Sequence, residues 1–350
     1  MTDLIGNTKA TTKATTKTTT RGKSPGKSFG NAPGKSHREG MTLMQLFQRF
    51  PDEDTAIKWF EDTRWKNGRY CPHCGSLSTS VRESGKPMPY RCRDCRSYFS
   101  VKTGTVMGGT QISLQKWVIA IYLQTTSLKG VSSMKLHRDL GITQKSAWFM
   151  LHRIRQSMKD EVEALSGPVE ADETYFGGLE KNKHASKKLN AGRGGVGKSI
   201  VAGIKDRTTN QVAAGVINNT TKAVLQGFVS DHADPDAVKY TDENSAYEGL
   251  DHHEAVNHSA GQYVDGEAHT NGIESFWSVM KRSQKGVYHK FSKKHLGRYV
   301  DEFVGRHNLR GEDTQQQMEE LVARMIGRRL MYKHLIADNG QESGARAAVV

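Results

Sequence analysis

The sequence has 350 residues, enough for two or three domains with at least one sizeable core. It carries 51 Lys and Arg against 37 Asp and Glu, and the formal net charge of +14 favours an acidic polymer, most often nucleic acid, as its partner. The sequence contains no apolar run long enough to cross a membrane and no apolar signal region. We therefore expect a cytoplasmic protein without a membrane partner.

Changes in composition divide the chain into five predicted segments. Apolar residues at helical spacing begin at Met41, and short strand-like runs begin after Gly167 and Pro168. The predicted segments are a disordered basic tail (1–40), helices plus a zinc ribbon (41–105), a helix-turn-helix-like segment (106–165), an α/β catalytic domain (166–310), and a peripheral helix with a tail (311–350).

The tail at 1–40 is rich in Thr, Ser, Gly, Pro and Lys and cannot build a core. Its cations are compatible with a weak DNA-binding arm and equally with an inert solvated segment. Helical periodicity follows at 41–50 and 52–65.

Two pairs of cysteines come next. Cys71 and Cys74 are separated by 17 residues from Cys92 and Cys95, and this C-x2-C-x17-C-x2-C spacing lies in the range of zinc sites. Four thiolates complete a tetrahedral site and leave no position open for a substrate. We predict a structural Zn²⁺ in a zinc ribbon, with the neighbouring His73 as a bystander.

Three helical stretches follow the cysteines, at 113–128, 132–140 and 144–158. A glycine at 141 separates the last two, which is the outline of a helix-turn-helix whose second helix enters the major groove of DNA. The same pattern fits an ordinary helical hairpin.

The segment 166–310 predicts an α/β domain. Strand-like runs begin at 169, 199, 211, 238 and 254, and helical runs cover 221–232 and 273–283. Past Arg310 the chain is helical and charged, which indicates a peripheral helix followed by a frayed tail.

Carboxylates in this domain are placed among residues that should be buried. On a strand, Glu170 and Asp172 share one face, and Asp242 ends another strand-like run. A helix would carry further polar residues on one face: Asn271, Glu274, Ser278 and Lys281. Two strand acids and one helix acid are what a site for two Mg²⁺ ions requires.

These motifs resemble those of the DDE transposases of bacterial insertion sequences that carry an N-terminal zinc ribbon, relatives of the eukaryotic Merlin elements. The matching blocks span 45–310. They are CPHCG, CRDCRSYFSVKTGTVM, ADETYFGG, YTDENSAY, HTNGIESFWSVMKR and GVYHKFSKKHLGRYVDEFVGRHN.

The resemblance implies an RNase H-like catalytic domain, a mixed sheet with flanking helices. Asp172 and Asp242 would take the first two acidic positions, with two Mg²⁺ or Mn²⁺ ions as cofactors. We choose Glu274 for the third position and Lys281 as a phosphate-holding residue. Family members differ at the third position, and Asn271 is a competitor for it.

The string GRGGVGKS at 192–199 satisfies the phosphate-loop pattern of nucleotide hydrolases. That loop requires a preceding strand and a following helix, whereas a polar basic stretch precedes this string and the strand-like IVAGI follows it. We interpret the match as chance and expect no nucleotide partner.

We therefore expect a nucleoid-associated DNA transposase that binds the terminal inverted repeats of its element, as a homodimer or higher oligomer, and performs phosphodiester hydrolysis and strand transfer into target DNA. Two alternatives stay open at this point. One is an RNase H-like nuclease or resolvase without strand transfer, and the other is a zinc-ribbon regulator with a degenerate catalytic domain.

Overall fold

The computed structural model describes residues 39–159, 163–178, 182, 184–189, 195, 197–256 and 269–341. The predicted tail at 1–40 lies, apart from its last two residues, outside the described residues, and so do residues 342–350. None of the described helices is both long enough and apolar enough to cross a membrane.

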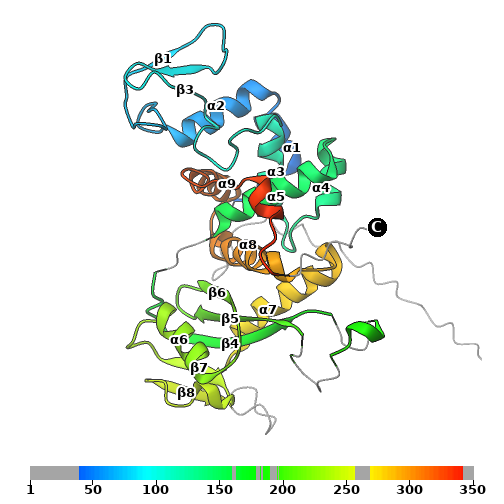
Figure 1. Ribbon diagram of the computed structural model, residues 1–350. Helices are drawn as coiled ribbons and strands as arrows, with labels where there is room; N and C mark the ends of the chain where they lie inside the picture. Colours follow the sequence, from blue (N-terminus) through cyan, green and yellow to red (C-terminus); the bar gives the residue numbers. More distant parts are fainter. Residues whose placement is uncertain are drawn as a thin grey trace, which may run out of the picture. The chain divides into compact units, whose positions relative to one another are not determined.

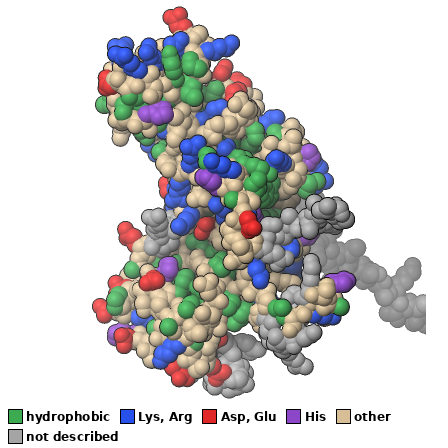
Figure 2. Space-filling view, viewed as in Figure 1, with side chains coloured by type: hydrophobic (Ala, Val, Ile, Leu, Met, Phe, Trp, Pro, Cys, Tyr) green, Lys and Arg blue, Asp and Glu red, His purple; other side chains and the backbone are tan. Residues whose placement is uncertain are grey.

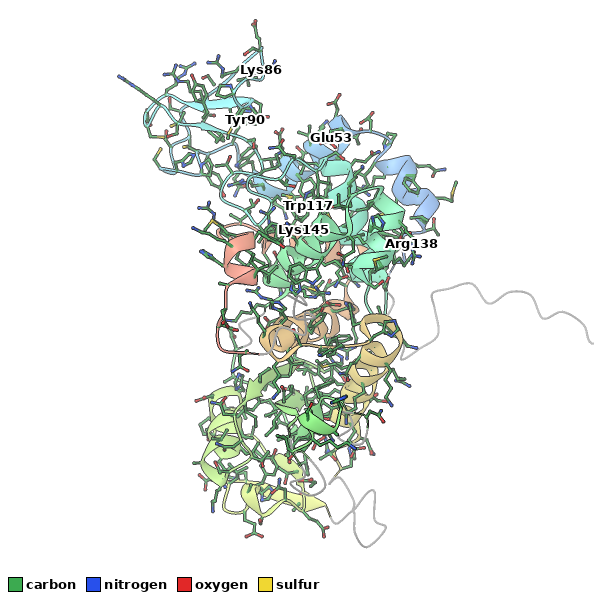
Figure 3. All side chains as sticks on the ribbon, turned by 45° about the vertical axis from the view of Figure 1, so that its right-hand side comes forward. Glu53, Lys86, Tyr90, Trp117, Arg138 and Lys145 are labelled. Atoms are coloured by element: carbon green, nitrogen blue, oxygen red, sulfur yellow. The ribbon has the colours of Figure 1, made fainter. Side chains whose placement is uncertain are left out.

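The predicted helices between residues 41 and 158 all form and share one apolar core (Figure 1). Trp117 is fully buried in this core and lies among the helices in Figure 3. The helices are α1 (Leu43–Arg49), α2 (Glu53–Arg64), α3 (Leu114–Thr126), α4 (Ser133–Leu140) and α5 (Gln144–Met158).

Local polar residues fix where these helices begin and end. The side chain of Asp52 accepts the N–H of Thr55 at 2.8 Å at the start of α2, and Thr143 accepts the N–H of Ser146 at 3.1 Å at the start of α5. Gly141 ends α4 with φ of 59°, a left-handed conformation that glycine adopts without strain. The short turn between α4 and α5 is therefore specified by sequence, as the helix-turn-helix outline requires.

The cysteine segment folds as a three-stranded antiparallel sheet in the order β1-β2-β3. Its strands are β1 (Thr79–Val81), β2 (Tyr90–Cys92) and β3 (Tyr98–Phe99). Aromatic residues form its core: Tyr90 and Phe99 are buried, and the ring of Trp65, next to the last residue of α2, lies 5.6 and 6.2 Å from their rings. The sheet therefore rests on the end of α2.

The catalytic segment contains a five-stranded mixed sheet in the order β6-β5-β4-β7-β8. The first three strands in sequence are antiparallel, whereas β7 and β8 run parallel to β4. This is the RNase H-like mixed sheet expected from the sequence. The strands are β4 (Val169–Phe176), β5 (Ser199–Asp206), β6 (Val212–Ile217), β7 (Lys239–Asp242) and β8 (His253–Val256).

Helices cover both faces of this sheet (Figure 1). The helix α6 (Lys222–His232) packs on one face, and α7 (Asn271–Ser283) and α8 (Leu296–Asn308) pack on the other. The alternation along β5 explains this arrangement, because Val201 joins the core of α7 and α8 whereas Ala202 and Ile204 join the core of α6.

The C-terminal helices differ from the expectation of a peripheral helix. The helix α9 (Thr314–Ala323) contributes Met318 and Leu321 to the same core as α1 to α5, because its apolar face is buried there rather than exposed. The backbone N–H of Val106 donates to the carbonyl of Met325 at 3.2 Å. The chain therefore returns to its N-terminal core, and α10 (Tyr332–Ile336) follows.

A buried carboxylate joins α5 to α8. Glu302 is fully buried, and its Oε2 accepts Nε of Arg155 at 2.5 Å. Its Oε1 accepts the hydroxyl of Tyr288 at 2.6 Å and also pairs with Arg306. The two guanidinium groups hold the pKa of Glu302 below its usual value against the opposing effect of burial, so the carboxylate is charged in the junction.

Candidate functional site

The four cysteines converge beside the small antiparallel sheet. The Sγ atoms of Cys71 and Cys95 lie 3.6 Å apart, those of Cys74 and Cys92 lie 3.7 Å apart, and all four lie within 4.8 Å of one another. A tetrahedral zinc ion with Zn–S bonds of about 2.3 Å separates its sulfurs by roughly 3.8 Å. The four residues therefore fit a structural zinc ion.

Two matching turns aim the thiolates at a common point. The N–H groups of Cys71 and Cys92 each donate to the carbonyl five residues ahead, at 2.8 and 3.0 Å. Gly75 and Arg96 occupy equivalent places in the two turns, with φ of 78° and 59°. His73 is exposed, and its backbone N–H rather than its ring contacts the Cys71 sulfur, at 3.4 Å.

We expect Cys92→Ser to release zinc and unfold residues 65–105, because binding of the metal and folding of such a small sheet are coupled. The measurements are zinc content of the purified protein and limited proteolysis across 65–105. His73→Ala is the matched control and should keep its zinc. Wild-type zinc content in Cys92→Ser would contradict the assignment.

The two predicted strand acids lie on adjacent parallel strands, Asp172 in the middle of β4 and Asp242 at the end of β7. Val169 pairs with Lys239 and Glu170 with Tyr240, and continuing this register brings Asp172 of β4 level with Asp242 of β7. Because side chains at matched positions point to the same face, the two carboxylates share one face of the sheet.

A second buried carboxylate docks α7 against β4. Glu170 is 2% exposed, and its Oε2 accepts the backbone N–H of Ile273 in the first turn of α7 at 2.9 Å. A Cβ at Gly272 would lie 2.6 Å from the same oxygen, so the close approach requires glycine. Since Glu170 and Asp172 share a strand face, this contact brings the start of α7 alongside Asp172.

An open pocket of about 520 Å³ lies between the middle of β4 and α7. Asp172, Glu274 and Lys281 all line it. Neither Asp242 nor Asn271 lines this pocket, and Asn271 is exposed as the first residue of α7. Of the two candidates for the third acidic position, Glu274 is the one that shares a pocket with Asp172.

Negative charge accumulates around Asp172. Burial raises the pKa of Asp172 to about 7, and the carboxylates of Glu173, Asp242 and Glu274 add to the rise. Among the described residues, no three of these carboxylates bring their oxygens as close together as the cysteines bring their sulfurs. Buried carboxylates that repel one another are stabilised by a cation, and oxygen donors of this kind suit Mg²⁺ or Mn²⁺.

Sequence reasoning missed the contacts of Glu173. Its side chain accepts the hydroxyl of Tyr247 at 2.9 Å and the amide of Asn244 at 3.0 Å. The backbone N–H of Asn244 in turn donates to Oδ1 of Asp242 at 3.1 Å. Glu173 therefore ties β4 to the turn that carries Asp242. An acid next to Asp172 was the only sequence signal, and alternation placed it on the opposite face.

Comparison with known proteins identifies the family. Residues 164–308 match a family described as the ISXO2-like transposase domain, and residues 51–97 match a family described as the transposase zinc-ribbon domain. The chain therefore contains an ISXO2-like transposase domain and a transposase zinc ribbon. It is also 28% identical over 283 residues to a protein of Halobacterium salinarum described as an uncharacterized protein in transposable element ISH50. The aligned region covers 76% of this chain and 94% of that relative.

The transposase's helix pair α4–α5 lies between the two matched ranges. Most of α5 is covered, with Met150, Leu151 and Ile154 buried. In its first turn Gln144 and Lys145 are exposed, and Figure 3 labels Lys145 there and Arg138 on α4. If α5 contacts DNA, its first turn is the part that can reach a base edge.

The phosphate-loop-like string lies largely outside the described residues, which omit 191–194 and 196. Ser199, its last residue, begins β5. A strand therefore follows Lys198 at the place where a phosphate loop continues into a helix.

Proposed function

We propose that the transposase binds the terminal inverted repeats of its element and cuts and joins DNA at a site formed by Asp172, Asp242 and Glu274. The observation that carries this proposal is that Asp172 and Glu274 line one pocket together with Lys281, while Asp242 lies level with Asp172 on the neighbouring strand. Enzymes that transfer phosphodiesters need carboxylates for metal ions and cations for phosphates.

Two divalent ions held by Asp172, Asp242 and Glu274 would activate the attacking oxygen and stabilise the leaving oxygen. The chain's own residues position the reactants. Lys281, which lines the same pocket, binds a phosphate near the scissile bond. Water attacks the phosphodiester at the element's end, and the freed 3′-hydroxyl then attacks the target DNA.

The contacts of two further carboxylates support this geometry. Glu170 holds the first turn of α7 against β4, and Glu173 holds the turn after β7. Neither residue is a metal ligand in this proposal. Both residues fix the distances between the three proposed ligands. Metal binding requires these distances to be correct to within a fraction of an ångström.

Recognition of the element's ends is assigned to the zinc ribbon and the α4–α5 pair. Lys and Arg side chains lie over the zinc ribbon in Figure 2, and the whole chain has a formal net charge of +14. Such a charge favours contacts with phosphates, so binding should weaken steeply with salt. Cutting two ends of one element requires two active sites, so we propose a dimer or higher oligomer on DNA, in the cytoplasm at the nucleoid.

The test uses purified protein, Mg²⁺ and a duplex that copies the end of the element, together with a target plasmid. Cleavage at the end followed by joining to the plasmid is the expected result. Cleavage without joining would favour a nuclease, and binding without either reaction would favour a regulator.

The same assay ranks the two candidates for the third acidic position. We expect Glu274→Gln to abolish cleavage and Asn271→Ala only to impair it, since Glu274 lines the pocket with Asp172 and Asn271 does not. Both substitutions are at exposed positions of α7, so the fold should tolerate them. The reverse ranking would assign the third position to Asn271.

A further inference from the structure

The end of α7 has an unusual helical turn. Residues Gln284–Tyr288 form a π-helical turn directly after Ser283, and such wide turns are frequent at functional sites. In a continuous α-helix, Tyr288 would lie seven residues after Lys281 and on nearly the same face. The wide turn instead lets the Tyr288 hydroxyl reach the buried Glu302 at 2.6 Å. The turn is therefore anchored in the core.

Three cations lie along this helix on the side of the catalytic pocket. Lys281, Arg282 and Lys285 all line the pocket that also contains Asp172 and Glu274, and all three are exposed. Within the described parts of the chain, none of the three forms an ion pair with a carboxylate. The pocket therefore has an acidic end and a cationic end.

The spacing of these charges fits a strand of DNA. At about 1.5 Å per residue, Lys281 lies roughly 10 Å and Lys285 roughly 16 Å along the helix from Glu274. One DNA strand advances about 3.4 Å per nucleotide, so these distances correspond to roughly three and five nucleotides. A strand that passes the acidic end of the pocket reaches both cations along one helix.

The favourable interaction of cations with the C-terminal end of a helix dipole accounts for some of this charge. It applies to Lys281 and Arg282, which lie in the last turn of α7. It applies also to Lys285, in the last turn of the π-helical segment that continues α7, but it does not explain why all three cations line the pocket.

We propose that Arg282 and Lys285 form a second subsite for the DNA backbone next to the phosphate assigned to Lys281, with Lys285 roughly two nucleotides beyond that phosphate. The inference rests on the proposed function, because it takes the pocket as the place where the DNA is cut. The ligand is the sugar–phosphate backbone of one strand. Lysine and arginine contacts of this kind fix the position of DNA and carry no base sequence.

The experiment measures binding of the full chain to a duplex copying the element's end, by fluorescence anisotropy in EDTA over a series of salt concentrations. Arg282→Ala and Lys285→Ala should each reduce the slope of log Kobs against log salt by about 0.9. That change corresponds to roughly eightfold weaker binding at about 0.1 M salt, if the whole contact is lost. Lys285→Arg should restore the wild-type slope.

Lys222→Ala is the matched control, because Lys222 is an exposed lysine on α6, on the opposite face of the sheet. Its slope should equal that of the wild type. Unchanged slopes in both Arg282→Ala and Lys285→Ala would overturn the subsite. Thermal unfolding midpoints within a degree or two of the wild type would show that each variant is folded, as expected at exposed positions.

The outcome is separable from that of the proposed function. Binding in EDTA requires neither metal ions nor cleavage, so a reduced slope in a chain that never cleaves DNA would support the subsite and contradict the catalytic proposal. If the wild-type chain cleaves DNA but neither Arg282→Ala nor Lys285→Ala changes the slope, the catalytic proposal is supported and the subsite is contradicted.

Discussion

Asp172→Asn and Asp242→Asn should each reduce Mg²⁺-dependent cleavage of the element's end by about a thousandfold or more. An amide keeps the shape of the side chain but removes a charge that a divalent ion needs, and a loss of about 4 kcal/mol in transition-state stabilisation is a factor of about a thousand. Asp172 is affected most directly, since it lies between the carboxylates of Glu173, Asp242 and Glu274. Cleavage rates with labelled end DNA give the measurement.

Binding of the same DNA in EDTA should be unaffected in both variants, which separates loss of chemistry from loss of recognition. Asp236→Asn is the matched control, because Asp236 is exposed before the start of β7, at the end of the strand remote from Asp242. It should cleave at the wild-type rate. Persistent cleavage by either Asp172→Asn or Asp242→Asn would remove that residue from the site.

Glu302→Ala should destabilise the fold by about 3–5 kcal/mol, because it leaves two buried guanidinium groups without their counter-charge. Arg155 is 1% exposed and Arg306 9% exposed, so water cannot replace the carboxylate fully. Urea unfolding of the purified chain measures the change. A loss of less than about 1 kcal/mol in the free energy of unfolding would mean that the junction between α5 and α8 rearranges to accommodate the missing carboxylate.

Glu320→Ala provides the comparison. Glu320 pairs with Arg324 at 2.8 Å on α9 but is 48% exposed, and surface pairs of this kind contribute about 0–1 kcal/mol. The double variant Arg155→Met with Glu302→Leu should be less destabilised than Glu302→Ala, since apolar residues of similar size satisfy a buried position without a charge.

The parts of the molecule that sequence could predict are those specified locally. The spacing of Cys71, Cys74, Cys92 and Cys95 fixes two turns, and each turn aims its own thiolates, so the zinc ribbon follows without knowledge of the rest. The strands of the five-stranded sheet could be predicted from their apolar runs, because this pattern is also local in the sequence. The position of Asp172 opposite Asp242 followed once the strands were known to be parallel neighbours.

The parts that sequence missed depend on partners far along the chain. The amphipathic pattern of α9 predicts that one face is buried but not that Met318 packs with α1 to α5. Glu173 alternates to the face opposite Asp172, and only the fold brings Tyr247 and Asn244 to it. The sequence favoured Glu274 over Asn271 for the third acidic position, and that choice stays a prediction, which the shared pocket of Glu274 and Asp172 supports.

The return of α9 to the N-terminal core also sets when a newly made chain can act. The helices α1 to α5 leave the ribosome early, but their core lacks Met318, Leu321 and Val322 until the last part of the chain is made. Synthesis adds about 5–20 residues per second, so the stretch 159–313 between α5 and α9 takes roughly 8–30 s. A chain that stops before α9 therefore has an unfinished N-terminal core.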